Sequence, residues 1–336
     1  MPPLLSPEQI AQQAAELLRQ GKLVAIPTET VYGLAADATN EDAVQKIFEV
    51  KGRPSNNPLI LHVDSLETAL PYIDLGSHPE SDRMVSMLRK LSAQFWPGPL
   101  SVVVKRGSGI ADSVCAGGDT IALRVPNHPL TLSILKHVGR PVAAPSANPS
   151  SYISPTSAHH VAISLGPLVD LIVDGGPCAV GVESTVVNLL SNPIAILRPG
   201  LISAEEIEQT LGCPVENFTP SREGPQAEEV LLSPGMLTKH YSPRTPVVLL
   251  PNITDFTALP EKVGAILFNE RPLPMTCNHR IVLSETGDLL KISAGLFAAL
   301  RELDQLDLDL IITDTCEPKG FGLAIMDRLL RASATS

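Results

Sequence analysis

The sequence has no paired cysteines and no long apolar run, and each absence narrows the class of protein. Its cysteines are five in number and stand singly, without a C-x-x-C pair, which argues against a disulfide framework and against a zinc site. No stretch approaches the roughly 20 apolar residues of a membrane-spanning helix. The first residues lack the positive cluster and apolar run of a secretory signal. We therefore expect a soluble, cytoplasmic globular protein with no metal site.

Positive charge is scarce as well. The net charge is -11, and acidic residues outnumber basic ones both before and after residue 213. Tight binding to a nucleic-acid backbone requires clustered cations that displace counterions from the phosphates. We therefore expect no stable nucleic-acid binding.

Three common catalytic signatures are missing. The chain has no G-x-x-x-x-G-K-[ST] phosphate loop, and Gly320-Phe321-Gly322 lacks the third glycine of a dinucleotide site. The run Gly181-Val182-Glu183-Ser184 departs from the G-x-S-x-G nucleophile elbow. A phosphate-loop enzyme, a dehydrogenase and a triad hydrolase are thereby disfavoured.

With 336 residues, the chain is long enough for two hydrophobic cores. Up to residue 212 short apolar strands alternate with amphipathic helices, and the first helix begins at a capping box formed by Ser6 and Gln9. Strands follow one another without a helix between them near 184–197, so the sheet should be mixed rather than parallel. The predicted strands are 23–27, 58–63, 100–105, 120–125, 141–144, 168–173, 184–189 and 194–197, and the predicted later helices are 41–50, 81–95, 129–137, 155–165 and 204–211. This pattern predicts an α/β domain with a twisted mixed sheet over residues 1–212.

The pattern changes after residue 212. Residues 213–243 are rich in proline and glycine and read as a linker, and a second α/β rhythm follows over 244–336. Strands are predicted at 247–250, 263–268, 280–283 and 308–313, with helices near 288–303 and 322–332. This second unit is predicted to be a smaller, Rossmann-like, three-layer α/β domain.

Polar residues gather where the predicted strands of the first domain end. Strand alternation places Thr120, Ala122 and Arg124 on one face, and a buried arginine there would need an anionic partner. Lysine and arginine after the helix at 41–50 could simply complement the end of that helix, but this does not explain Arg53, Asn57 and His62 together. In an otherwise acidic domain, the cations are spaced so as to form one anion-binding cavity: Lys51, Arg53, Arg124 and Arg198.

Five motifs, taken in order, resemble the YrdC-like family over roughly residues 10–205. They are Pro27-Thr28-Glu29-Thr30-Val31-Tyr32-Gly33-Leu34, Lys51-Gly52-Arg53-Pro54 with Asn57-Pro58-Leu59-Ile60-Leu61-His62, Pro145-Ser146-Ala147-Asn148, Glu183-Ser184-Thr185-Val186 and Arg198-Pro199-Gly200. With the segment from Pro234 to Pro243 and the second domain, the whole chain is similar to the long, two-domain threonylcarbamoyl-AMP synthases of that family.

The resemblance implies a reaction in which L-threonine, bicarbonate and ATP give threonylcarbamoyl-AMP and pyrophosphate. It implies L-threonine binding by Thr30, His62, Arg124, Ala144 and Ser184, and ATP binding by Arg53, Asn57, Thr120, Ser146, Ser154, Arg198 and Tyr241. Lys51 and Arg53 would stabilise the charge that develops on the phosphates, with Mg²⁺ arriving together with ATP. His62 is one candidate for the group that accepts the amine proton, and the sequence leaves that group open.

The resemblance also implies a division of labour. The product would pass to a tRNA threonylcarbamoyl transferase complex, which modifies the adenosine next to the anticodon. Tyr241 and its neighbours would act as a lid over the nucleotide. The second domain shows no recognisable chemistry, and we expect it to stabilise or regulate the first.

Two other functions compete with this one. An RNA-binding, ribosome-associated module is disfavoured by the negative charge of both parts of the chain. Carbamoyl-adenylate transfer of the hydrogenase-maturation type would call for acylphosphatase-like and zinc-finger segments, and the cysteine spacing provides no zinc finger.

Overall fold

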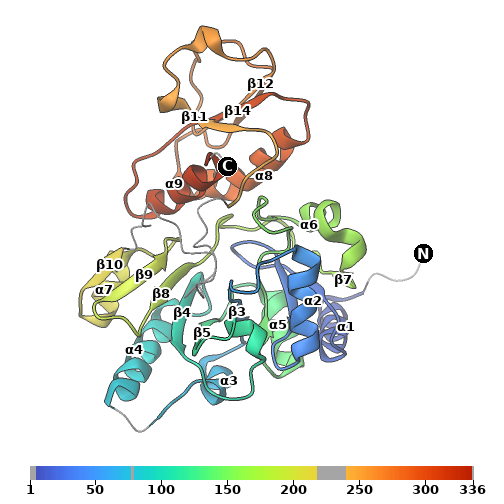
Figure 1. Cartoon of the computed structure of the whole chain (residues 1–336), viewed down its shortest axis with the longest axis vertical. Coiled ribbons are helices and arrows are strands. Elements are labelled where there is room, and N and C mark those ends of the chain that lie inside the picture. The colour runs from blue at the N-terminus through green and yellow to red at the C-terminus, as the bar shows by residue number, and fades with distance from the viewer. Residues whose placement is uncertain (1–4, 77–78, 218–239, 335–336) are drawn as a thin grey trace.

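The computed structural model describes residues 5–76, 79–217 and 240–334, which form two α/β units, each built around its own sheet (Figure 1). The part of the predicted linker between 218 and 239 lies outside the described residues. Among the described residues, no helix is both long enough and apolar enough to cross a membrane.

The first unit contains a ten-stranded sheet with the order β10-β9-β8-β4-β5-β3-β6-β2-β1-β7. The sheet contains both parallel pairs, such as β3 with β5, and antiparallel pairs, such as β4 with β5, which confirms the predicted mixed sheet. Its strands are β1 (Val24–Ile26), β2 (Gly33–Asp37), β3 (Ile60–His62), β4 (Leu100–Lys105), β5 (Thr120–Arg124), β6 (Val142–Ala143), β7 (Leu171–Ile172), β8 (Thr185–Asn188), β9 (Ile194–Arg198) and β10 (Val215–Asn217).

Seven helices accompany this sheet in the described residues: α1 (Pro7–Arg19), α2 (Glu41–Lys51), α3 (Leu66–Ala69), α4 (Pro79–Phe95), α5 (Pro129–Val138), α6 (Ala158–Leu165) and α7 (Ala204–Leu211). The capping box predicted for the first helix is present, since Ser6 Oγ accepts from the Gln9 backbone N–H and the Gln9 side chain accepts from that of Ser6. Because this cap satisfies exposed N–H groups of the first turn, α1 begins where the sequence indicates.

Strand alternation sends neighbouring residues to opposite faces of the sheet. On one face, Leu61, Leu123 and Val187 join a large apolar cluster with residues of α2, α4 and α7. On the other face, Ile60 and Ala122 belong to a small separate cluster with Val103, Val186 and Leu197, and only the β1–β2 end of that face is covered by α1 and α5. The side chains two residues further along, His62 and Arg124, therefore lie on the side of the sheet that α2, α4 and α7 leave uncovered.

Two strands and a short helix of the first unit are absent from the sequence prediction. Strand β2 consists mainly of glycine and alanine, is buried throughout and shows no apolar–polar alternation. Strand β10 lies at residues 215–217, so the sheet extends past the domain boundary predicted at residue 212, and the linker begins later than predicted. Helix α3 has only four residues, too few for a helical periodicity to show.

The second unit has a four-stranded parallel sheet with the order β11-β14-β12-β13. Its strands are β11 (Val247–Leu249), β12 (Val263–Leu267), β13 (His279–Val282) and β14 (Leu310–Thr313), and its helices are α8 (Leu289–Asp304) and α9 (Phe321–Ala332). Both helices pack on one face. The other face is covered by loop residues and the short 3₁₀ turns η4 (Leu250–Asn252) and η5 (Phe256–Ala258), so the third predicted layer contains no α-helix.

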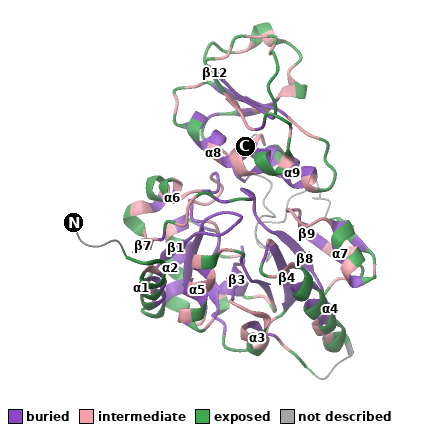
Figure 2. Ribbon diagram, turned by 180° about the vertical axis from the view of Figure 1, so that it is seen from behind, coloured by how far each residue is buried: buried purple, intermediate pink, exposed green. Residues whose placement is uncertain are grey.

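Helices α8 and α9 lie between the small sheet and the first unit (Figures 1 and 2). Leu296 and Phe297 of α8 share an apolar cluster with Ile153 and Val182 of the first unit. Ser293 Oγ donates a hydrogen bond of 2.6 Å to the Val180 carbonyl. The two units therefore share one continuous buried interface rather than meeting only through the linker.

At Gly181 the backbones of the two units approach each other closely. It has a φ of +79°, and a Cβ added there would lie 2.3 Å from the Ser293 carbonyl oxygen and 2.5 Å from Ala294 Cα. Both atoms belong to the backbone of α8, which cannot move aside as a flexible side chain could. Only glycine fits this position.

A comparison of two glycines tests the packing of the units. Gly212 has a similar φ of +73° but nothing within 4 Å of its added Cβ. We expect Gly212→Ala to lower the free energy of unfolding by about 1 kcal/mol, the cost of a left-handed backbone. Gly181→Ala should cost about 1 to 3 kcal/mol more, because the methyl group also overpacks the interface. Thermal and urea unfolding of both variants would check this, and equal unfolding midpoints would contradict the interface described here.

Candidate functional site

One cavity opens at the ends of strands β3 and β5, on the sheet face left free by α2, α4 and α7. Sixteen residues from widely separated parts of the chain line it: Thr28, Thr30, Val31, Gly33, Arg53, Ile60, His62, Arg124, Ala144, Pro145, Ser146, Glu183, Ser184, Arg198, His240 and Tyr241. Nine of the twelve residues predicted to bind substrate are among them. The cavity volume is about 50 Å³, which is room for a few water molecules.

Arg124, the last residue of β5, is buried and fixed from three sides. Its Nη1 donates to Thr30 Oγ1 at 2.9 Å, and its Nε donates to the Gly98 carbonyl at 3.2 Å. Its Nη2 lies 2.7 Å from Glu29 Oε2. Glu29 is the anionic partner that a buried arginine at this position requires. The sequence analysis did not single out Glu29, although an acidic residue within a motif of small and hydroxyl residues was a visible signal.

His62, the last residue of β3, is the second buried polar group beside Arg124. Burial, and then the positive charge of Arg124, lower the pKa of His62 to about 3. The imidazole is therefore neutral at neutral pH. Its Nδ1 has no hydrogen-bond partner among the described residues, so it is available to a ligand.

Arg53 follows the end of α2 and folds back onto the chain that enters β3. Its Nη2 donates to Asn57 Oδ1 at 2.5 Å and to the Pro58 carbonyl at 2.8 Å, while its Nε donates to the Asn57 carbonyl at 3.0 Å. Burial, with the nearby charge of Arg198, lowers the pKa of Arg53 to about 9. Arg53 therefore still carries its positive charge at neutral pH, and Asn57 holds it in place rather than lining the cavity.

Lys51 lies beside the cavity and not on its lining. Its Nζ donates to the Ser146 and Asn148 carbonyls, which ties the end of α2 to the loop after β6. Burial, and then the charge of Arg53, place the pKa of Lys51 well below its ordinary value. The structure thus shows the lysine amino group ordering the loop that carries Ser146.

Ser184 and Arg198 form a second polar pair across β8 and β9. Arg198 Nε donates to the Ser184 carbonyl at 3.0 Å and its Nη2 donates to Ser184 Oγ at 3.1 Å. Ser184 Oγ also lies 2.8 Å from Ser101 Oγ of β4. The pairing requires Gly200, because a Cβ at that position would lie 2.2 Å from the Thr185 backbone nitrogen.

Besides Asn57, two residues predicted to bind ATP lie away from the lining. Ser154 Oγ donates to Glu183 Oε1 at 2.5 Å, so its hydroxyl is already engaged with a carboxylate of the cavity wall. Thr120 is at the opposite end of β5 from Arg124 and lines a different hollow, together with Lys105 and Asn188. The predicted ATP set is therefore not gathered in a single pocket in this conformation.

His240 and Tyr241 close the cavity from the side of the second unit. Tyr241 is 1% exposed, has a φ of +61° and stacks on Phe297 of α8 with ring centroids 5.5 Å apart. Burial raises the pKa of Tyr241 to about 12. Burial and the charges of Arg53 and Lys51 lower the pKa of His240, so the ring is neutral, and its Nδ1 has no partner among the described residues. His240 is not among the site residues predicted from the sequence.

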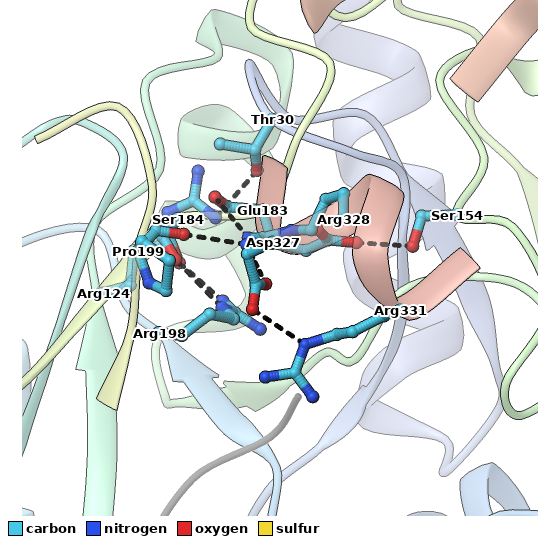
Figure 3. A network of polar contacts seen from close by, with 10 residues as sticks. All are labelled: Thr30, Arg124, Ser154, Glu183, Ser184, Arg198, Pro199, Asp327, Arg328 and Arg331. Atoms are coloured by element: carbon cyan, nitrogen blue, oxygen red, sulfur yellow. Dashed lines mark hydrogen bonds and ion pairs between the residues drawn. The ribbon is translucent and has the colours of Figure 1, made fainter. Parts of the chain in front are cut away.

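The charge of the lining is strongly one-sided. Arg53, Arg124 and Arg198 line the same cavity, as the sequence analysis predicted for these cations. Glu183, which also lines it, forms an ion pair of 2.9 Å with Arg328 of α9 (Figure 3). Because buried cations are stable only with anionic or hydrogen-bonding partners, this cavity is suited to small anionic ligands.

The described residues hold no group of three or more histidine, cysteine, aspartate or glutamate side chains arranged to bind a metal ion. The cavity lining likewise offers a single carboxylate, which is paired with arginine. The side chains of the described residues therefore provide no cage for a resident divalent cation.

Two family models together match nearly the whole chain. A model of the Sua5, YciO and YrdC proteins, described as telomere recombination, matches residues 16–200. A second, described as the C-terminal domain of threonylcarbamoyl-AMP synthase, matches residues 202–334.

Curated relatives agree with these models. The chain is 39% identical over 332 residues to a threonylcarbamoyl-AMP synthase of Pyrococcus abyssi, covering 95% of this chain and 93% of the relative. It is 39% identical over 337 residues to the enzyme of that name from Bacillus subtilis, covering 97% and 93% of the two chains. A shorter protein, a putative threonylcarbamoyl-AMP synthase of Mycobacterium tuberculosis, is 36% identical over 201 residues that cover 59% of this chain and 88% of the relative.

A solved structure matches both units at once. The crystal structure of the Pyrococcus abyssi Sua5 protein complexed with L-threonine has a TM-score of 0.85 and 38% identity, and it covers 98% of this chain and 96% of that one. The match confirms the predicted combination of a large mixed sheet with a smaller second α/β domain. By its sequence over nearly the full length and by its fold, the chain belongs to the two-domain threonylcarbamoyl-AMP synthase family.

Proposed function

We propose that this protein is a threonylcarbamoyl-AMP synthase that converts L-threonine, bicarbonate and ATP into threonylcarbamoyl-AMP and pyrophosphate. The observation that carries the proposal is the convergence of Arg53, Arg124 and Arg198 on one buried cavity. A carboxylate and a chain of phosphates are the anionic groups of these substrates, and arginine suits both because its N–H groups form a planar fork.

L-threonine is assigned to the side of the cavity around Arg124. There Arg124 would take the carboxylate, and Thr30, His62, Ser184 and the Ala144 backbone would surround the amine and the side chain. All five line the same cavity. A neutral His62 fits this role, because its unpartnered Nδ1 can make a hydrogen bond without adding charge. With a pKa of about 3 the same imidazole holds a proton poorly at neutral pH, so we assign His62 to binding and not to proton acceptance.

ATP is assigned to the side around Arg53 and Arg198. Arg53, Ser146, Arg198 and Tyr241 line the cavity and would contact the nucleotide directly. Asn57 would act by holding Arg53, to which its side chain is already bonded. For Ser154 and Thr120 a direct contact requires that the pocket change shape, since one is bonded to Glu183 and the other lines a different hollow.

The chemistry requires two bond-forming steps. The threonine amine attacks the carbon of bicarbonate, and water leaves as the carbamate forms. A carbamate oxygen then attacks the α-phosphorus of ATP, and the bond to the β-phosphate oxygen breaks to release pyrophosphate. No covalent bond to the protein is needed. Arg53 would stabilise charge on the phosphates, and Lys51 would contribute by fixing the Ser146 loop or by turning its amino group toward them.

Mg²⁺ belongs to this scheme as part of the substrate. Because the described side chains provide no cage for a divalent cation, the ion would be held by the phosphate oxygens of ATP and by water. Bound in that way, it would neutralise part of the phosphate charge. The arginines would then hold the remaining anionic oxygens.

Tyr241 and His240 would serve as the movable cover of the pocket. In the described conformation the cavity has room for only a few waters, far less than a nucleotide occupies. Tyr241 is held by stacking on Phe297 of α8. Opening of this cover would admit ATP, and closure would keep water away from the labile carbamate.

The product would pass to a tRNA threonylcarbamoyl transferase complex, as a mixed anhydride must be consumed by a further acyl transfer. The acidic balance of the chain fits an enzyme that does not itself hold tRNA. The cytoplasmic location expected from the sequence stays a prediction. The second domain matches the model of the threonylcarbamoyl-AMP synthase C-terminal domain, which favours this function over carbamoyl transfer of the hydrogenase-maturation type.

Pyrophosphate release from ATP tests the function directly. We expect release to require L-threonine and bicarbonate together, because the nucleophile is the carbamate that the two form. L-serine and ammonium in place of threonine are the controls for the amino acid. Release without threonine, or no release with all substrates present, would contradict the assignment.

Arg124→Met tests the threonine side. We expect the KM for L-threonine to rise by about 100-fold, since a charge-assisted bidentate contact is lost, while the KM for ATP should change less than about threefold. Arg83→Met, an exposed arginine on α4, is the matched control and should behave as the wild type. Equal increases in both KM values would show that Arg124 does not distinguish the two sides of the pocket.

A further inference from the structure

Helix α9 of the second domain carries a buried arginine that reaches the wall of the active site. Arg328 is 1% exposed, and Figure 3 shows its guanidinium beside Glu183 and Pro199 of the first domain. We propose that Arg328 is a positioning residue, supplied by the second domain, that holds Ser184 and Arg198 in the geometry in which they bind substrate. The inference rests on the function proposed above, because it assigns a task to the second domain within that reaction.

The hydrogen bonds of Arg328 join two separate stretches of the first domain. Its Nε donates to Glu183 Oε2 at 2.9 Å, and its Nη1 donates to the Pro199 carbonyl at 2.9 Å. Glu183 is the residue before Ser184, and Pro199 is the residue after Arg198. One guanidinium therefore fixes the chain at the start of β8 and at the end of β9. A planar arginine fork can make both contacts at once, which a lysine ammonium on its single flexible stem cannot do in the same geometry.

The contact also determines which arginine pairs with the negative charge of Glu183. Burial by itself raises the pKa of Glu183, but the charges of Arg328 and Arg198 and the hydrogen bond from Ser154 leave that pKa below its ordinary value. The carboxylate is therefore ionised and lies next to a substrate-binding arginine. With Arg328 present, Glu183 has a partner of its own. Without Arg328, the same carboxylate would turn to Arg198 and compete with the phosphates for it.

The rest of the second domain holds Arg328 in place. Asp327 Oδ2 accepts from Arg328 Nη1 at 2.8 Å, and Asp327 Oδ1 accepts from Arg331 Nε at 2.9 Å. The Arg328 guanidinium also lies 5.4 Å from the centre of the Tyr241 ring. Cation–π contact over this distance connects the positioning residue to the tyrosine that closes the pocket.

Helix α8 reaches the same carboxylate from the other side. Arg301 donates to the carbonyls of Ile153 and Ser154, and Ser154 Oγ donates to Glu183 Oε1. Both helices of the second domain thus act on Glu183, one directly and one through Ser154. The serine that the sequence analysis assigned to ATP is, in this structure, part of that support.

The test compares Arg328→Met with Ser293→Ala in the full chain. Ser293 makes a buried hydrogen bond between the domains, and its hydroxyl donates to the Val180 and Leu290 carbonyls and not to Glu183 or Pro199, so its variant controls for general weakening of the interface. Pyrophosphate release with saturating L-threonine would give kcat and the KM for ATP. We expect Arg328→Met to lower kcat/KM for ATP by roughly 10- to 100-fold, the usual effect of losing a partner that orients a binding group, and Ser293→Ala to stay within about threefold of wild type.

A second substitution separates positioning from folding. In Arg328→Met with Glu183→Gln, the uncompensated carboxylate is gone, so we expect kcat/KM to recover by about 10-fold relative to Arg328→Met alone. If Arg328→Met does not fold, Arg328→Lys is the variant to measure, and it should keep the Glu183 pair while losing the Pro199 contact. Activity of Arg328→Met within about threefold of Ser293→Ala would overturn the proposal.

Hydrogen exchange of the substrate-free protein provides a readout that does not depend on the reaction. In Arg328→Met, amides of residues 184–200 should exchange faster than in wild type, while those of β12 and β14 stay unchanged. Unchanged exchange over 184–200 would refute the positioning role even if the enzyme assay worked. Conversely, a wild type that releases no pyrophosphate while Arg328→Met exchanges faster would refute the reaction and leave the structural role of Arg328 standing.

Discussion

Three guanidinium groups buried at one face of one sheet are the constraint on which the rest of this structure depends. Each of Arg53, Arg124 and Arg198 has lost most of its water, and each keeps its charge only because neighbouring oxygens replace that water. Carbonyls do much of this work, as at Gly98, Pro58 and Ser184. Neutral acceptors orient an arginine without cancelling its charge, so the cavity stays attractive to anions.

Carboxylates are used sparingly around the same cavity. Glu29 lies beside Arg124, away from the cavity lining, and Glu183 is engaged by an arginine from another domain. In both cases the carboxylate stabilises the fold without taking the position that an anionic ligand would occupy. Burial is the main reason why His62 and His240 are neutral, and the neighbouring positive charges act in the same direction, since a proton on either ring would add a further uncompensated cation.

Much of the fold could be predicted from the sequence, because most of its elements are apolar strands with clear turns or helices with clear caps. Strand β2 could not be, since glycine and alanine buried on both faces leave no alternation, and β10 could not be, since it joins the sheet only through β9. For the site, motif resemblance indicated which residues gather. It could not indicate that the Lys51 amino group would bind two carbonyls or that Ser154 would face Glu183, because both depend on loops that meet only in three dimensions. Arg328 lies some 145 residues from Glu183 along the chain, and nothing in its local sequence marks it.

Helices α8 and α9, which lie between the small sheet and the first unit, are relevant when family members with and without a second domain are compared. The Mycobacterium tuberculosis relative aligns with 59% of this chain, a share close to the extent of the first domain. A truncation of the present chain after β10 would not reproduce such a protein. It would uncover the apolar surface at Ile153 and Val182 and leave the Glu183 carboxylate without its arginine. A first domain that folds alone must therefore cover this surface with residues of its own, whereas in this chain the second domain covers it and supplies the arginine that pairs with Glu183.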